Sequence, residues 1–255
     1  AMGHTAKPGQ PNSLELAARC YFPLGWAPGG ATISMTAADL IKFAKAHLNK
    51  GVSEKGQSWL SATSVKAMQH PRIQLPEDAY FLANQWGLGW QLLDRANAPG
   101  VVGHGGVVVG QSSLMNMVPE KNLVIAILQN RVKTDVLYQL MQTLLKELAD
   151  IEISEKPPLT KPHQDLQRFE GSFTSVGVEA RVAIQDNQLT LKATPTLGTF
   201  DGFTRILKPI SDNGFAAYSE TGERESNVIF QHFDPTGRPN SVYSLFRQYN
   251  RVPSA

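Results

Sequence analysis

The spacing of apolar residues predicts two amphipathic helices in the first part of the chain. Over residues 36–48, leucine and alanine side chains recur every four positions, and Gly51 follows as a stop signal. Thr36 with Asp39 has the pattern of a capping box at the start of this helix. A second helix is expected over residues 135–149, where leucine and methionine side chains form one wide apolar face.

The chain between these two helices has the pattern of β-strands. Its last strand is apolar at consecutive positions from Leu123 to Leu128, which is typical of a strand covered on both faces. Pro119-Glu120-Lys121 predicts a tight connection before that strand. The expected strands span residues 86–93, 101–106, 107–118 and 122–129. The pattern therefore predicts a sheet flanked by helices.

The composition changes after residue 150. Residues 151–163 are polar and contain three prolines, which is typical of a linker. Beyond it, short strands alternate with hairpin signals at Asp186-Asn187, at Asn213-Gly214 and at residues 234–237. We therefore expect three regions: a helix-and-sheet domain over residues 1–150, a linker over 151–163, and an antiparallel β domain, a small barrel or sandwich, over 164–255.

Composition and charge exclude several classes of function. The 255 residues are 42% hydrophobic, enough for a large core, and Lys plus Arg (24) nearly balance Asp plus Glu (22) without a run of like charges. Nucleic acid is therefore not an expected partner. The longest apolar run, at residues 123–128, is too short to span a membrane. A single cysteine, Cys20, leaves no internal disulfide, and no export signal is visible near Ala1.

Cofactor and metal sites are not expected either. The histidines are scattered and none is paired at i and i+4, so the pattern of a zinc site is missing. The glycines of residues 103–110 lack the spacing of a dinucleotide-binding loop. We therefore predict that the protein works without a cofactor or metal.

The segment Gly103-His104-Gly105-Gly106 is the strongest candidate for chemistry. Two adjacent glycines on a strand let the backbone of a ligand approach the strand edge, and the neighbouring histidine can reach polar groups of that ligand. The same four residues also fit a glycine-rich bend with a hydrogen-bonded histidine. The motif alone does not decide between these two interpretations.

Three segments, residues 25–30, 34–40 and 103–106, together resemble in order and spacing the serine beta-lactamase-like family of class C beta-lactamases and D-alanyl-D-alanine carboxypeptidases. The resemblance covers about residues 2–149 and implies an α/β (α+β) transpeptidase-like fold with an antiparallel sheet. It places His104, Gly105 and Gly106 on the family's Lys-Thr-Gly or His-Thr-Gly strand, and it gives the backbone N–H of Val107 to the oxyanion hole. Gly105 replaces the usual threonine, which removes a hydroxyl that would contact a substrate carboxylate.

The family's nucleophile is not found in this sequence. That chemistry needs a serine with a lysine three residues later, together with a Tyr or Ser proton relay near an asparagine. No serine here has a lysine at that distance. Ser211-Asp212-Asn213 spells a relay motif, but it lies beyond His104 at an Asn-Gly turn, and we expect it to be a turn only. We therefore expect both catalytic motifs upstream of Ala1.

The resemblance then implies the C-terminal part of a serine hydrolase that forms an acyl-enzyme on an amide, an ester or a beta-lactam. This chain alone would be inactive. Its expected partners are a small-molecule or peptide substrate and the upstream portion of the same protein, with self-association as a further expectation. By resemblance the location would be periplasmic or secreted.

The C-terminal region, from Phe169-Glu170-Gly171 onward, resembles the lipocalin-like β domain that is often appended to these hydrolases. There it can shape the entrance of the active site, and a structural appendage without a ligand is equally compatible with the sequence. The alternative for the whole chain is a non-catalytic binding or scaffolding protein with a vestigial active-site strand.

Overall fold

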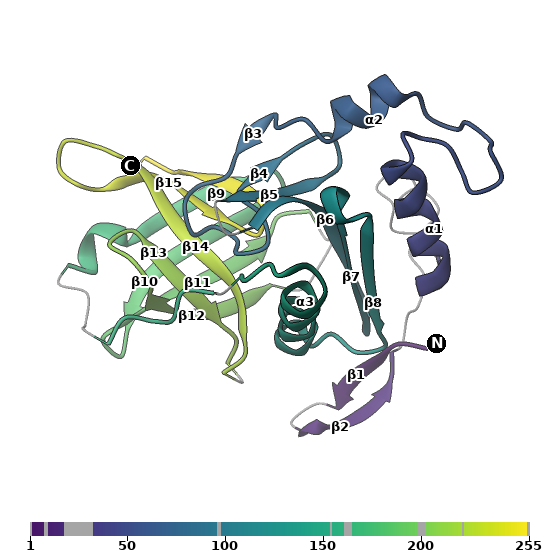
Figure 1. Ribbon diagram of the computed structural model, residues 1–255. Coiled ribbons are helices and arrows are strands. Elements are labelled where there is room, and N and C mark those ends of the chain that lie inside the picture. Colours follow the sequence, from purple (N-terminus) through teal and green to yellow (C-terminus); the bar gives the residue numbers. More distant parts are fainter. Residues whose placement is uncertain are drawn as a thin grey trace. The chain divides into compact units, whose positions relative to one another are not determined.

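The computed structural model divides the chain into two compact units (Figure 1). The first unit comprises Ala1–Gln74 and Leu82–Ser154, and the second comprises Leu75–Phe81 and Glu155–Ala255. The structure describes residues 2–7, 10–17, 33–95, 98–153, 155–160, 165–197, 202–220 and 222–253. Residues 25–30, one of the three segments that carry the family resemblance, and Cys20 lie outside the described residues.

The first unit contains a six-stranded antiparallel sheet with the order β3-β4-β5-β6-β7-β8. Its strands are β3 (Ile73–Gln74), β4 (Gln85–Trp86), β5 (Gln91–Arg95), β6 (Ala98–Val108), β7 (Gln111–Val118) and β8 (Leu123–Gln129). The one-turn 3-10 helix Pro119–Lys121 joins the last two strands, as the tight connection predicted. A separate hairpin precedes the sheet and consists of β1 (His4–Lys7) and β2 (Gln10–Leu16).

Two long helices lie on opposite faces of the strands β6–β8 (Figure 1). Helix α1 (Ala37–Leu48) begins after Thr36, whose hydroxyl accepts a hydrogen bond from the N–H of Asp39 at 3.2 Å, as the capping pattern predicted. Helix α3 (Thr134–Ala149) contacts β7 and β8 through a face that includes Leu137, Met141 and Leu145. The predicted sheet with flanking helices is confirmed. The short helix α2 (Ala62–Met68) was not predicted.

The sequence misplaced two strand boundaries. The stretch 86–93 is not one strand, because a turn separates β4 from β5, with the N–H of Gly87 donating to the carbonyl of Trp90 at 2.8 Å and Gly89 at φ +78°. The expected break between residues 106 and 107 is also wrong. Strand β6 continues to Val108, and the chain reverses at Gly110 (φ +71°), where a Cβ would lie 2.7 Å from the backbone nitrogen of His4. Valines lie on both sides of residue 106, so the pattern of apolar residues does not change where the strand was expected to end.

The second unit is a closed eight-stranded antiparallel barrel, which confirms the predicted β domain as a barrel. Its strands are β9 (Gly171–Ser175), β10 (Val178–Gln185), β11 (Gln188–Pro195), β12 (Phe203–Pro209), β13 (Gly214–Tyr218), β14 (Arg224–Phe233), β15 (Pro239–Ser244) and β16 (Arg247–Arg251). Asp186 and Asn187 both have positive φ (48° and 61°), as the tight turn between β10 and β11 requires.

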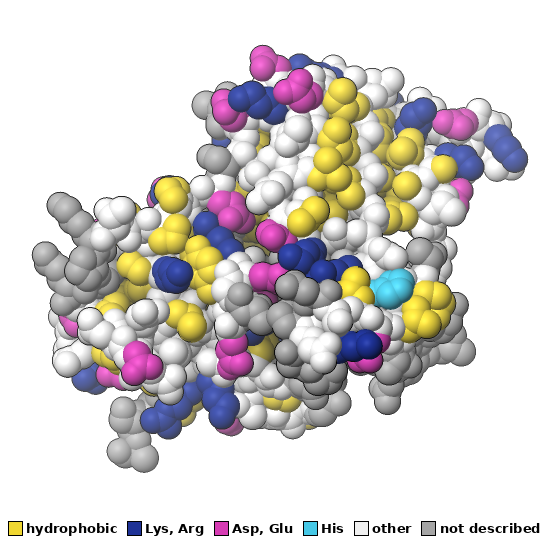
Figure 2. All heavy atoms as spheres, turned by 90° about the horizontal axis from the view of Figure 1, so that it is seen from below, with side chains coloured by type: hydrophobic (Ala, Val, Ile, Leu, Met, Phe, Trp, Pro, Cys, Tyr) yellow, Lys and Arg dark blue, Asp and Glu magenta, His cyan; other side chains and the backbone are white. Residues whose placement is uncertain are grey.

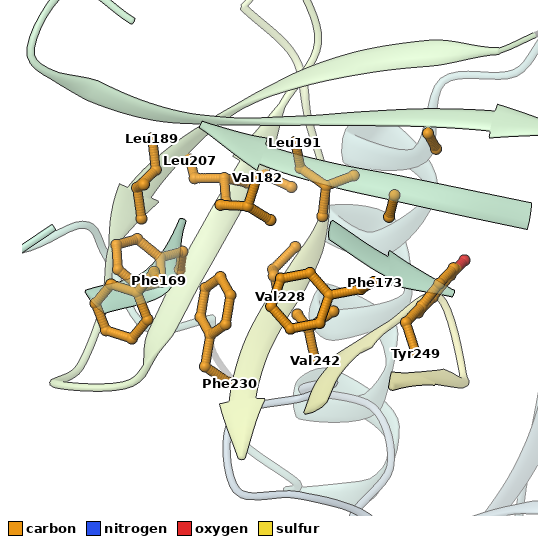
Figure 3. Close-up of a cluster of buried hydrophobic side chains, with 14 of the residues drawn as sticks. Phe169, Phe173, Val182, Leu189, Leu191, Leu207, Val228, Phe230, Val242 and Tyr249 are labelled. Carbon is orange, nitrogen blue, oxygen red and sulfur yellow. The ribbon is translucent and has the colours of Figure 1, made fainter. Parts of the chain in front are cut away.

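Side chains fill the interior of the barrel (Figure 3). Phe169, Phe173, Phe215 and Phe230 are each at most 2% exposed and pack against one another with ring centroids 4.5–6.2 Å apart. Aliphatic residues from neighbouring strands surround these rings, among them Val182, Leu189, Leu191, Leu207, Val228 and Val242. A barrel of eight strands is just wide enough for such a core. The chain's own side chains therefore fill the interior of the barrel.

Candidate functional site

Strand β6 carries the predicted motif along an open stretch of strand edge. Gln91, the first residue of β5, pairs with Gly103 on one side of β6, and β7 pairs with β6 from Val102 to Val108 on the other. Residues 104–108 therefore have β7 on one side and no described strand on the other. Unpaired backbone N–H and C=O groups at such an edge can bind an extended ligand.

His104 is exposed on this stretch and has two defined contacts. Its Nδ1 lies 2.6 Å from the carbonyl oxygen of Gly105, and its ring meets the ring of Trp86 edge-on at 5.7 Å between centroids. A carbonyl oxygen can only accept, so this contact places a proton on Nδ1, and in the neutral ring the lone pair is then on Nε2. In this tautomer Nε2 is able to accept a proton or a hydrogen bond.

The three glycines of the motif differ in what surrounds them. A Cβ at Gly103 would lie 1.9 Å from Oδ1 of Asn116, so this position tolerates no side chain. At Gly105 the nearest atom to a Cβ would be 3.5 Å away, which is ordinary contact. At Gly106 a Cβ would lie 2.9 Å from Oγ of Ser113, whose side chain can rotate away. Gly103 is therefore required by packing, whereas Gly105 leaves room beside the exposed edge.

Ser113 is a polar residue of this region that the sequence analysis missed. It pairs with Gly106 across β6 and β7, which brings its hydroxyl next to the motif. The missed signal is the strand register, because a turn at residues 109–110 places residue 113 opposite residue 106. Val107 follows on the same edge with its side chain 60% exposed.

The structure brings together the four predicted residues, His104 to Val107, as consecutive positions of one strand. The sequence has no serine followed three residues later by a lysine that could act with them. Ser64, the serine nearest to Lys66 in sequence, lies in α2, where its N–H and hydroxyl are both hydrogen-bonded to the cap residue Ser61. Within the described part of the chain no group of three or more His, Cys, Asp or Glu side chains is arranged to hold a metal.

Ser211-Asp212-Asn213 is a turn between β12 and β13, as expected. The N–H groups of Ile210 and Ser211 donate to the carbonyl of Gly214, and the guanidinium of Arg168 donates to Asp212 O and Asn213 Oδ1, both at 2.9 Å. The turn lines a cavity of about 460 Å³ inside the barrel unit. A second cavity, about 570 Å³, lies beside residues 192–195 and 202–205 of the same unit. Neither includes a residue of β6.

The chain is similar in sequence to a protein family and to a curated protein. A family model described as "Beta-lactamase" matches residues 2–150, more than half of the sequence. The chain belongs to the beta-lactamase family. Among curated proteins of this family, the chain is 35% identical over 158 residues to "Penicillin-binding protein 4" of Amycolatopsis lactamdurans, a match that covers 61% of this chain and 41% of that protein.

Solved structures share the fold. A crystal structure of SurE matches 99% of this chain and 55% of its own, with 23% identity and a TM-score of 0.66. A structure of SurE with D-Leu matches 85% of this chain and 50% of its own, with 21% identity and a TM-score of 0.55. The chain therefore spans about half the length of these structures and 41% of the length of the curated relative. No helix in the described residues is long and apolar enough to cross a membrane.

Proposed function

We propose that this chain supplies the substrate-binding strand of a serine hydrolase that works through an acyl-enzyme on an amide, an ester or a beta-lactam. The open edge of β6 beside His104 is the observation that carries the proposal. A substrate in extended conformation would lie along residues 104–107, with its reacting carbonyl oxygen at the N–H of Val107. The attacking serine and its lysine would come from polypeptide outside these 255 residues, and the location would be periplasmic or secreted.

The role of His104 follows from its tautomer. With Nδ1 directed at the carbonyl of Gly105, Nε2 is free to accept a hydrogen bond from the substrate or to assist proton transfer. Gly105 leaves the edge without the hydroxyl that binds a substrate carboxylate in the family. The preferred substrate would therefore depend less on a terminal carboxylate than that of a carboxypeptidase.

One rival function is favoured by a specific observation. Because the sequence has no serine followed three residues later by lysine, a non-catalytic binding or scaffolding protein with a vestigial β6 is also consistent with it. The two proposals differ in what the complete gene encodes. A Ser-x-x-Lys in the same polypeptide or its partner supports the hydrolase, and a partner without one supports the scaffold.

The test is a comparison of the chain alone with the chain joined to its nucleophile-bearing part. Alone, it should hydrolyse no chromogenic cephalosporin and take no covalent label from a fluorescent penicillin or a fluorophosphonate. In the joined protein, His104→Ala should lower kcat/KM by about one to two orders of magnitude, because the imidazole becomes charged when it takes up a proton, and a hydrogen bond to a charged group is worth about 1.5–3 kcal/mol.

His70→Ala is the matched control, since His70 is also exposed but lies outside β6. Gly105→Thr should shift preference toward substrates with a carboxylate. Stoichiometric labelling of the isolated chain at any serine, or a His104→Ala protein with wild-type kcat/KM, would contradict the proposal.

A further inference from the structure

The turn between β4 and β5 lies at the start of the open edge of β6. The strand register places Trp86, Gln91 and Gly103 in one cross-strand row, because Trp86 pairs with Gln91 and Gln91 pairs with Gly103. Strand β5 begins at Gln91, so residues 104–108 extend past it on the side of this turn. Trp86 therefore lies level with the first residues of the candidate site.

Backbone hydrogen bonds hold both ends of this short turn. The carbonyl of Trp86 accepts a hydrogen bond from the N–H of Arg72 at 2.8 Å, and the N–H of Gly87 donates to the carbonyl of Trp90, also at 2.8 Å. Trp90 is itself buried and belongs to the core cluster that includes Ala44 of α1. The indole of Trp86 is therefore attached to a backbone that is anchored in the core of the sheet unit.

The end of α2 contacts the same turn. The N–H of Leu88 donates to the carbonyl of Met68, the last residue of α2, at 2.9 Å. A Cβ at Gly87 would collide with that same carbonyl oxygen, so glycine is required for this close approach. Any larger side chain at residue 87 would push the turn, and Trp86 with it, away from the helix.

The ring of Trp86 meets that of His104 in a defined geometry. The ring centroids are 5.7 Å apart and the ring planes differ by 82°. Such an edge-to-face pair is attractive because the positive edge of one ring meets the negative face of the other. The bond from Nδ1 to the carbonyl of Gly105 directs one edge of the imidazole, and the indole restricts the plane in which the imidazole lies.

The hydrogen bond alone holds the imidazole only weakly. Its acceptor is the carbonyl of the next residue in the chain, and His104 is exposed, so water competes for both groups. Trp86 is half-buried, and its ring contacts the imidazole where water would otherwise do so. The indole therefore favours the one ring orientation in which Nδ1 reaches the carbonyl of Gly105.

We propose that Trp86 is a positioning residue, which holds His104 in the orientation with the proton on Nδ1 and with Nε2 open to the substrate. The fit of Gly87 against α2 sets the place of the indole. The proposal deepens the hydrolase function and rests on it for its catalytic consequence, whereas its structural part is tested in the chain alone.

The structural experiment measures the imidazole nitrogen signals of His104 by NMR in the 255-residue chain, assigned with His104→Gln. At about pH 8.5, where an ordinary histidine is neutral, these signals report which nitrogen carries the proton. The wild type should carry it on Nδ1. Trp86→Leu should shift the ratio of the two tautomers by about two- to tenfold toward Nε2, which is the factor that an aromatic pair contributes. Trp86→Phe keeps an aromatic face and should restore the wild-type ratio.

Gly87→Ala tests the same contact without a change in either ring. Its Cβ would collide with the carbonyl of Met68, so the turn should shift and the cross-peaks between the rings of Trp86 and His104 should weaken. The tautomer ratio should move in the same direction as in Trp86→Leu. If one of these two variants does not fold, the other gives the same decision.

The matched control is Trp59→Leu. Trp59 is also a solvent-accessible tryptophan of the sheet unit, but its ring contacts those of Phe43 and His47. Its removal should leave the signals of His104 unchanged. A wild-type imidazole protonated on Nε2 would overturn the proposal. An unchanged tautomer ratio in the variants at residues 86 and 87 would do the same, because the bond to Gly105 would then orient the ring by itself.

The catalytic consequence is measured in the joined protein with its nucleophile. Trp86→Leu should lower kcat by about two- to tenfold with KM little changed, and Trp86→Phe should recover the rate. Because Trp86 acts through His104, Trp86→Leu should cause no further loss in a His104→Ala background. An equal loss in both backgrounds would overturn the positioning role, since Trp86 would then act on the substrate directly. The expected NMR effect in a joined protein without acyl-transfer activity contradicts the hydrolase function instead.

Discussion

The barrel of the second unit closes on itself, whereas the described sheet of the first unit ends in the strands β3 and β8. In the barrel, β16 returns to β9, and every strand has two neighbours. In the sheet, β8 lies at one end, and six of its seven residues, Leu123 to Leu128, are apolar. Helices α1 and α3 cover the two faces of β8, which accounts for this composition. The barrel therefore has no edge strand, whereas the described sheet has two.

The first unit also has exposed apolar side chains gathered on one face of a helix. Helix α3, which covers β8, leaves Val136, Leu140 and Leu148 exposed at intervals of four and eight residues. Figure 2 shows a row of hydrophobic side chains on one face of the molecule. Positions four apart share one face of a helix, so these three residues form a stripe. We name Val136, Leu140 and Leu148 the open face, and propose that it binds further polypeptide.

The largest expected effect is on the barrel core. Phe230→Ala removes a ring that contacts Phe169, Phe173 and Phe215, and it should lower the free energy of unfolding of the barrel by about 3–5 kcal/mol. All four tryptophans lie in the first unit, so tryptophan fluorescence reports the sheet and tyrosine signals report mainly the barrel. When Phe230→Ala is unfolded in denaturant, the midpoint measured by tyrosine signals should fall far more than the midpoint measured by tryptophan fluorescence. Val176→Ala, at a residue 87% exposed, is the control.

Equal shifts of both transitions would contradict the comparison, because they would mean that the units unfold as one.

The next effect concerns the open face. We expect the chain to associate with itself or with the remaining part of its family domain, and Leu140→Lys should weaken that association by about 1.5–3 kcal/mol, the value of burying one leucine. Light scattering and binding of an apolar dye measure this change. Leu245→Lys is the matched control, since Leu245 is similarly exposed (47% against 44%) but lies in the closed barrel. A chain that stays monomeric at high concentration and binds no dye would contradict it.

The sequence predicted well those features that depend on local chemistry. The cap at Thr36, the apolar face of α3 and the turn at Asp186-Asn187 each rest on a few neighbouring residues, and the structure contains all three. Strand ends were less predictable where valines run through a turn. Gly110 marks the true end of β6 only through its close approach to His4, more than a hundred residues away.

The sequence predicted that the candidate site lies on a strand, but not which part of that strand is exposed or which residues lie beside it. His104 to Val107 were identified from the motif, yet their open edge depends on where β5 begins, and Ser113 depends on the register of β7. The membership of Leu75–Phe81 in the barrel unit rests on hydrogen bonds that Asp78 accepts from Lys156 and Asn227, about 80 and 150 residues away in the chain. Nothing in the local sequence around residue 78 signals those partners.

The smallest expected effect concerns a histidine buried in the sheet unit. His47 is 2% exposed and lies among the rings of Phe43, Trp59 and Trp90, with centroids 4.9–5.2 Å away. Among the described residues neither ring nitrogen has a hydrogen-bond partner. Burial lowers the pKa of His47 below its ordinary value of 6.5, because the charged form would lose its hydration without compensation.

The direction of the pH dependence follows from that lowered pKa. Below about pH 6.5 the unfolded chain binds a proton at residue 47 that the folded chain does not, so the contribution of His47 to stability is complete above this pH and is lost as the pH falls toward the folded pKa. One proton corresponds to at most about 1.4 kcal/mol per pH unit. His47→Leu should therefore flatten the tryptophan-detected stability between pH 6.5 and the acid transition, whereas His70→Leu, at an exposed histidine, should leave its slope unchanged. If His47→Leu and wild type lose stability with the same slope, the ring of His47 is protonated in the folded state, and the aromatic cluster is stabilised by a cation on its rings rather than by a neutral imidazole.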